Sequence, residues 1–94
     1  MTIRIRFLGS LQYDIKQKSF NYQIKSEISI REIVSELIEN PQFKELRSFF
    51  SESLDVKRSL LIFRNDQEIS ALEGMTTKVK TDDTLSFIPV IHGG

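Results

Sequence analysis

Residues 29–41 have the sequence SIREIVSELIENP, which predicts the main helix of the chain and thereby limits the fold. Ser29 and Glu32 match a capping box, in which the two side chains satisfy free backbone N–H groups at the helix start. Asn40-Pro41 predicts the helix end, because a residue before proline avoids helical backbone angles. Between these signals, apolar residues at helical spacing form one stripe, consisting of Ile30, Ile33, Val34, Leu37 and Ile38.

Two strands are predicted before this helix. Residues 3–8 and 20–25 have apolar side chains at every second position, a period that indicates a strand with one buried face. The intervening residues 11–18 are polar enough to form the loop of a hairpin. The apolar members of the two alternations are Ile3, Ile5, Phe7, Phe20, Tyr22 and Ile24.

A second, shorter helix and three more strands are predicted after Pro41, which favours the first position of a new helix. Residues 60–63 form a continuous apolar run typical of a buried strand, and residues 67–69 form a short return strand after the turn signal Asn65-Asp66. Asp82-Asp83 is interpreted as a turn, not a metal site, before the last strand. Phe43, Leu46, Phe49 and Phe50 lie at helical spacing in the second helix. Of these, Phe43, Leu46 and Phe50 are interpreted as core, with a ligand pocket as the alternative.

This order of elements predicts an α+β fold with one mixed sheet and a main helix across one face. A right-handed crossover after the first hairpin brings a later strand parallel to the first strand. The order is that of a single-domain β-grasp fold, with one main helix and a second short helix. We expect the domain to cover residues 1–90 and residues 91–94 to be a flexible tail.

The composition limits the classes of function. The chain has 94 residues, 39% of them hydrophobic and 28% charged, with 13 Lys plus Arg against 13 Asp plus Glu. Such a neutral domain is not expected to bind nucleic acid directly. Without cysteine, and with His92 as the sole histidine, it is expected to have no metal site and no cysteine nucleophile. We expect neither a signal peptide nor a membrane span, and therefore a cytoplasmic location.

Gly93-Gly94 follows the last predicted strand directly. Glycine has no Cβ, so its backbone bends freely and other groups can approach it closely. Residues 90–94 reach at most roughly 17 Å when extended, enough for a terminal carboxylate to enter a narrow catalytic channel. A frayed, inert end is the alternative interpretation.

Residues 81–94, TDDTLSFIPVIHGG, resemble the C-terminal segment of the ubiquitin-like sulfur carriers, and most closely that of the ubiquitin-related modifiers. In that branch an acidic turn precedes an apolar strand, and the chain ends in His-Gly-Gly. Residues 61–65 are similar to the third strand and turn of the family, and the insertion at residues 41–50 fits the modifier branch. Small archaeal modifiers are equally similar. His92 favours the modifiers, whereas Pro89 favours a relative, the small subunit of molybdopterin synthase.

The resemblance implies a ubiquitin-like carrier that is not itself an enzyme. A ubiquitin-activating-type enzyme would use ATP to adenylate the Gly94 carboxylate, with Gly93 as its slim lead-in and no cofactor held stably by the chain. A sulfur donor protein would convert the adenylate to a thiocarboxylate. The sulfur would serve the 2-thiouridine of transfer RNA through a downstream thiolation enzyme, or Gly94 would be joined to target lysines. The alternatives are a molybdopterin synthase subunit and a β-grasp interaction module that is never activated.

Two further features are candidate contacts for these partners. His92 is a candidate for guiding the tail, or it simply packs in the channel of the partner. Arg4 and Arg6 share a strand face opposite the apolar positions, and a neighbouring last strand would add Ser86, Ile88 and Val90. We expect an exposed apolar and cationic patch suited to docking, with a merely solvated sheet face as the alternative.

Overall fold

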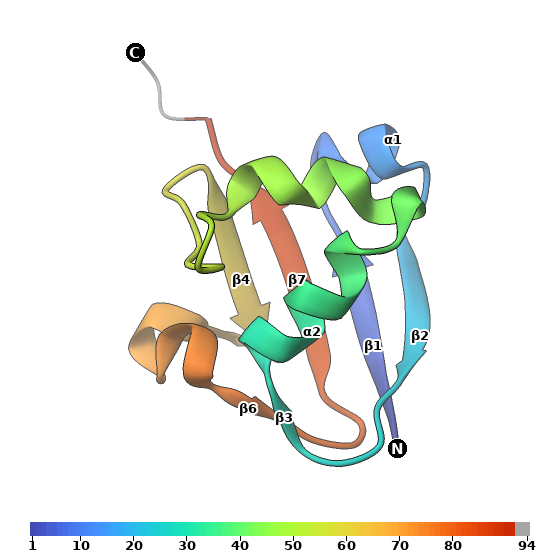
Figure 1. Cartoon of the computed structure of the whole chain (residues 1–94), viewed down its shortest axis with the longest axis vertical. Coiled ribbons are helices and arrows are strands. Elements are labelled where there is room, and N and C mark those ends of the chain that lie inside the picture. Colours follow the sequence, from blue (N-terminus) through green and yellow to red (C-terminus); the bar gives the residue numbers. More distant parts are fainter. Residues whose placement is uncertain (92–94) are drawn as a thin grey trace.

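The computed structural model describes residues 1–91 and consists mainly of a five-stranded sheet. The strand order is β2-β1-β7-β4-β5, with β7 in the centre (Figure 1). β1 runs antiparallel to β2 and parallel to β7, whereas β4 runs antiparallel to both β7 and β5. The bounds are β1 Thr2–Phe7, β2 Ser19–Gln23, β4 Leu60–Arg64, β5 Gln67–Glu68 and β7 Thr84–Pro89. This mixed sheet confirms the predicted β-grasp arrangement.

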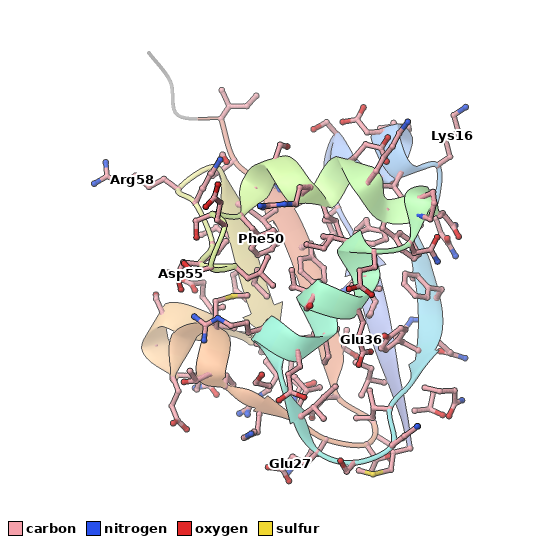
Figure 2. The ribbon with its side chains drawn as sticks, viewed as in Figure 1. Lys16, Glu27, Glu36, Phe50, Asp55 and Arg58 are labelled. Carbon is pink, nitrogen blue, oxygen red and sulfur yellow. The ribbon has the colours of Figure 1, made fainter. Side chains whose placement is uncertain are left out.

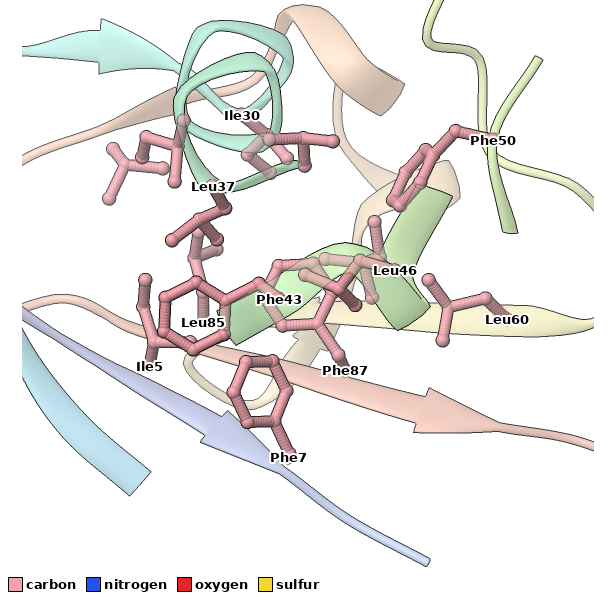
Figure 3. Close-up of a cluster of buried hydrophobic side chains, with 14 of the residues drawn as sticks. Ile5, Phe7, Ile30, Leu37, Phe43, Leu46, Phe50, Leu60, Leu85 and Phe87 are labelled. Atoms are coloured by element: carbon pink, nitrogen blue, oxygen red, sulfur yellow. The ribbon is translucent and has the colours of Figure 1, made fainter. Parts of the chain in front are cut away.

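The register of the two central strands explains the alternation in the sequence. Ile5 of β1 lies beside Leu85 of β7, and Phe7 lies beside Phe87. Successive side chains of a strand point to opposite faces, so these residues share the inner face of the sheet. All four are at most 2% exposed and form the floor of the core (Figure 3).

Helix α2 (Ile30–Ile38) covers this inner face, as the sequence predicts. The hydroxyl of Ser29 accepts a hydrogen bond from the backbone N–H of Glu32 at 3.2 Å, which is one half of the capping box. The carboxylate of Glu32 in turn accepts a hydrogen bond from the Ser29 hydroxyl at 3.5 Å. The buried stripe consists of Ile30, Ile33, Val34 and Leu37, while Ile38 is half-buried.

The second helical segment is the 3-10 helix η1 (Pro41–Phe49), which lies beside α2 over the same face. Its side chains complete an aromatic cluster. The ring of Phe43 stacks on Phe20 of β2 with centroids 5.0 Å apart, and it also lies 5.8 Å from the ring of Phe7. The buried positions Phe43, Leu46 and Phe50 confirm the core interpretation, and Phe49 is half-buried.

The prediction of a polar loop at residues 11–18 is wrong in part. A short helix, α1 (Leu11–Ile15), lies within the hairpin connection. Leu11 and Ile15 are one helical turn apart, and both are buried against the core. Lys16 ends the helix in the left-handed conformation, with φ of 65°.

A two-stranded sheet outside the main one was not predicted. β3 (Ile28–Ser29) and β6 (Lys78–Val79) pair antiparallel, which ties the entry of α2 to the segment before β7. Two short 3-10 turns, η2 (Ile69–Ala71) and η3 (Gly74–Thr76), connect β5 to β6. The return strand β5 and the positive φ of Asn65 in the preceding turn agree with the sequence analysis.

Candidate functional site: the C-terminal tail and the outer sheet face

The central strand carries the candidate reactive tail out of the domain. After β7, the backbone N–H of Val90 donates to the carbonyl of Ser59 at 2.9 Å, next to the start of β4. Ile91 then has 96% of its surface exposed. The predicted reactive and guiding residues, His92, Gly93 and Gly94, lie outside the described residues, as does most of the predicted flexible tail. The described part of the chain therefore ends at an exposed residue at one end of the sheet.

The turn after β1 supports the end of β7. Gly9 has φ of 58°, a left-handed conformation that a residue with a side chain adopts only with strain. This turn brings Gly9 against the ring of Pro89, while the backbone N–H of Leu8 donates to the carbonyl of Phe87 at 3.0 Å. The last residues of β7 are thus held on both sides, by β1 and by β4.

The start of β7 is fixed by a buried carboxylate. Asp83 is 5% exposed and accepts two hydrogen bonds, from the backbone N–H of Lys80 at 2.9 Å and from Nδ2 of Asn65 at 3.0 Å. The side-chain oxygen of Asn65 accepts from the backbone N–H of Thr84 at 2.9 Å. Asp82 has φ of 70°, so the predicted turn at Asp82-Asp83 is confirmed, and Asp83 also joins it to the β4–β5 turn.

The structure brings most of the predicted docking residues together on the outer face of the sheet. Arg4 and Arg6 are exposed on β1, and Arg6 lies beside Ser86 of β7. Ile88, two residues further along β7, is half-buried on that face. Ser86 is only 5% exposed, so it adds little to a docking surface, contrary to the expectation. Val90 is half-buried beyond the end of β7.

Two residues of this face were missed by the sequence analysis. Leu61 lies opposite Ile88, and Phe63 lies opposite Ser86, so both belong to the outer face and are half-buried. All four residues of the run 60–63 are apolar, so the sequence does not show which of them point to the inner and which to the outer face. The register with β7 shows this. We call the resulting surface the outer sheet patch, and its members are Arg4, Arg6, Leu61, Phe63 and Ile88.

The charge of the outer sheet patch is positive. Its two charged members are both arginines, although Glu68 of β5 lies opposite Phe63 at the border of the patch. The guanidinium of Arg4 donates to the Ser19 hydroxyl at 2.9 Å. In the described part of the chain, the ion pair found joins Arg31 to Asp55 at 2.6 Å, on the side where α2 faces the loop before β4. An apolar centre beside two arginines is suited to a partner surface with apolar and acidic groups.

Within residues 1–91, no cluster of three or more His, Cys, Asp or Glu side chains could hold a metal ion. None of the helices there is long and apolar enough to cross a membrane. The features of the described residues that bear on the candidate site are therefore the outer sheet patch and the contacts that fix both ends of β7.

Comparison with known proteins identifies the family of this chain. The family model described as Urm1, ubiquitin related modifier, matches residues 2–94. Small archaeal modifier protein 3 of Haloferax volcanii is 23% identical over 94 residues, with 100% of both chains covered. The ubiquitin-related modifier 1 homolog of Dictyostelium discoideum is 26% identical over 97 residues, also with 100% of both chains covered. The solution structure of Urm1 from Trypanosoma brucei has a TM-score of 0.81 at 22% identity, covering 99% of this chain and 95% of that one.

A mixed sheet with α2 and η1 on its inner face, and a central strand that leads into a Gly-Gly tail, define a ubiquitin-like β-grasp protein. Because the family model covers almost the whole sequence, the chain belongs to the ubiquitin-related modifier family, one of the ubiquitin-like sulfur carriers. Members of this class are small carrier and modifier proteins, not catalysts.

Proposed function

We propose that this chain is a sulfur carrier and protein modifier whose Gly94 carboxylate is adenylated by a ubiquitin-activating-type enzyme. The observation that carries the proposal is the family match through residue 94, combined with a central strand after which Val90 bonds to Ser59 and Ile91 is exposed. The protein would act in the cytoplasm, where the activating enzyme draws on ATP. It would hold no cofactor stably.

The chemistry needs a partner because a carboxylate at neutral pH resists nucleophiles. In the activating enzyme, the Gly94 carboxylate attacks the α-phosphate of ATP, giving an acyl-adenylate and releasing pyrophosphate. A persulfide of the sulfur donor protein attacks the acyl carbon and expels AMP. A thiol then cleaves the resulting acyl disulfide by reduction, which leaves a thiocarboxylate on Gly94. Gly93 gives the slim backbone that the channel of the enzyme requires, and His92 guides it.

The outer sheet patch would dock the activating enzyme. Arg4 and Arg6 would face acidic side chains of that enzyme, while Ile88 would pack against its apolar residues. Val90, at the base of the tail, would complete the contact. Charge at the rim of an interface mainly accelerates association, so we expect this docking to weaken with rising salt.

Two products can follow from the same activated tail. A thiolation enzyme would take the sulfur for 2-thiouridine in transfer RNA, so this chain need not touch the nucleic acid. Alternatively, a lysine amine of a target protein would attack the Gly94 carbonyl and form an amide. The family match favours these two products over a role in molybdopterin synthase.

The test is intact mass spectrometry after incubation with ATP, the activating enzyme of the host, a persulfide donor and a thiol reductant. The full chain should exchange one oxygen for one sulfur, whereas a variant lacking Gly93-Gly94 should not change. The truncated protein must keep the circular dichroism spectrum of the full chain, which makes it a matched control. Failure of the full chain to form an adenylate would overturn the proposal and favour an interaction module without activation.

Deletion in cells distinguishes the destinations of the sulfur. Loss of thiolated uridine is the expected result, with loss of lysine conjugates if the modifier role operates too. Loss of molybdenum cofactor with normal thiolated uridine would instead assign the chain to molybdopterin synthesis.

A further inference from the structure

A groove lies at the edge of the main sheet furthest from β4 and β5, between β2 and the helical layer. Its lining comes from β2 on one side and from α2 and η1 on the other. A second hollow continues it past the end of β2, and the two share Gln23 and Glu36. The lining of the first hollow is Phe20, Asn21, Tyr22, Gln23, Glu36, Leu37, Asn40, Gln42 and Phe43.

The backbone of β2 offers hydrogen-bonding groups along this groove, because β2 is an edge strand. The backbone N–H of Phe7 donates to Lys18, and that of Ile24 donates to Met1, both at 2.8 Å. Hydrogen-bonded positions alternate along an antiparallel pair, so Asn21 and Gln23 direct their backbone N–H and C=O groups away from β1. They are about 6.8 Å apart, the repeat of an extended chain.

The floor of the groove is aromatic and is held in place. The rings of Phe20 and Phe43 are stacked at an angle of 11°, and Tyr22 meets Phe20 edge-on. The hydroxyl of Tyr22 donates to the carboxylate of Glu36, which places this acid over the groove (Figure 2). Burial is the larger cause and this hydrogen bond the next cause that raise the pKa of Tyr22, so its hydroxyl stays protonated at neutral pH.

We propose that the free edge of β2 binds an extended segment of a partner protein by strand addition. Apolar side chains of that segment lie over Phe20 and Phe43, and a basic side chain faces Glu36. The charge argument rests on the first hollow, where Glu36 is in the lining and no Lys or Arg is, whereas Lys25 joins Glu36 in the lining of the second. Strand addition takes affinity from backbone hydrogen bonds and specificity from alternate side chains, and this groove offers both.

The occupant is a partner protein and not a second copy of this chain. If two β2 edges paired antiparallel, the Glu36 carboxylates of both copies would approach the same interface, and like charges there oppose pairing. Exposed Lys18 and Lys25 stand at the two ends of β2, where lysines protect an edge strand from pairing with its own kind. A segment with its own basic residue avoids the repulsion at Glu36.

The groove is separate from the end of β7, so this proposal goes beyond the proposed function and does not depend on it. β1 lies between β2 and β7 (Figure 1), and Val90, after β7, bonds to Ser59 next to the start of β4. A partner held at β2 therefore does not cover Val90 or Ile91. Such a partner could keep the carrier at the protein that consumes it.

The experiment is a titration of isotope-labelled full chain, followed by NMR, with the peptide acetyl-Ser-Val-Thr-Lys-Thr-Ile-Ser-amide. In the added strand, Val, Lys and Ile face the groove, and the two Thr amides face the backbone of β2. We expect saturable shifts and slower hydrogen exchange at the amides of Asn21 and Gln23. A peptide with Glu in place of Lys should bind about tenfold more weakly, and Glu36→Gln should weaken the Lys peptide about two- to fivefold.

Matched controls distinguish strand addition from nonspecific binding of the peptide. Methylation of the two Thr amides keeps the side chains but removes the backbone donors, and it should abolish binding to the wild-type chain. Asn21→Pro should do the same, whereas Asn21→Ala keeps the N–H and should bind. Glu52→Gln makes the same charge change in the exposed loop before β4 and should have no effect.

Three results would overturn the proposal. They are equal binding of the methylated peptide, shifts confined to the outer sheet patch, and no saturable shift at millimolar peptide. None of these results involves ATP or Gly94, so failure here leaves the proposed function intact.

Discussion

Replacing Asp83 with alanine should lower the free energy of unfolding by about 3 kcal/mol. The carboxylate is buried and accepts hydrogen bonds from the backbone N–H of Lys80 and from Nδ2 of Asn65. A hydrogen bond to a charged group contributes about 1.5–3 kcal/mol. Asn65 is exposed and can bond water instead, so the loss of its hydrogen bond to Asp83 costs about 1.5 kcal/mol or less. The Lys80 amide loses its side-chain acceptor and supplies the larger part.

Urea unfolding followed by circular dichroism measures this loss. For a domain of this size, about 3 kcal/mol corresponds to a fall in Tm of roughly 12–24 °C. The control is Asp82→Asn, one residue earlier, where the exposed side chain has no such contacts and asparagine tolerates the positive φ. It should change stability by less than about 0.5 kcal/mol.

A double-mutant cycle with Asn65→Gly tests the cause. The glycine tolerates the positive φ of that position, so the cycle isolates the link between the two side chains. We expect a coupling energy of about 1 kcal/mol. If the free energy of unfolding of Asp83→Ala lies within about 0.5 kcal/mol of the wild-type value, the carboxylate does not stabilise the turn and the reasoning is refuted.

Three further outcomes are expected. Phe43→Ala should cost about 3–5 kcal/mol in urea unfolding because it removes a buried ring from the aromatic cluster, and Phe49→Ala at a half-buried site should cost clearly less. The pKa of Tyr22 is raised by burial and a hydrogen bond, so its stabilisation is complete below about pH 10 and is lost as pH rises further. The free energy of unfolding should therefore fall more steeply above that pH in wild type than in Tyr22→Phe, and parallel curves would contradict this. Reversing both Arg4 and Arg6 to Glu should lower kcat/KM for adenylation at least about tenfold at low salt without changing stability, whereas an unchanged rate would remove the outer sheet patch from docking.

The sequence predicts the fold well where one face of an element is buried. Ile3, Ile5 and Phe7 alternate because β1 has one inner and one outer face, and α2 carries its stripe because only one side meets the sheet. These patterns depend on burial alone and need no knowledge of the neighbours. The element order then limits the arrangement to few topologies.

Features that depend on pairing were not predicted. Leu61 reads as part of a buried run, and its outer position follows only from its register with Ile88. The pair β3–β6 consists of two-residue strands far apart in the sequence, so neither has a detectable period. α1 is five residues long, and its one signal was the spacing of Leu11 and Ile15. The groove at β2 is invisible for the same reason, since it exists only once α2 and η1 lie beside an unpaired edge.

The position of β7 between β1 and β4 has a consequence for biosynthesis. A chain made only as far as residue 80 contains two hairpins with no strand to join them, and it lacks the buried residues Leu85 and Phe87. Ribosomes make β7 last of all the strands, shortly before the glycines. The chain can therefore complete its sheet only when synthesis is nearly finished. Under the proposed function, a prematurely terminated product would have neither a stable domain nor the Gly94 carboxylate that the activating enzyme accepts.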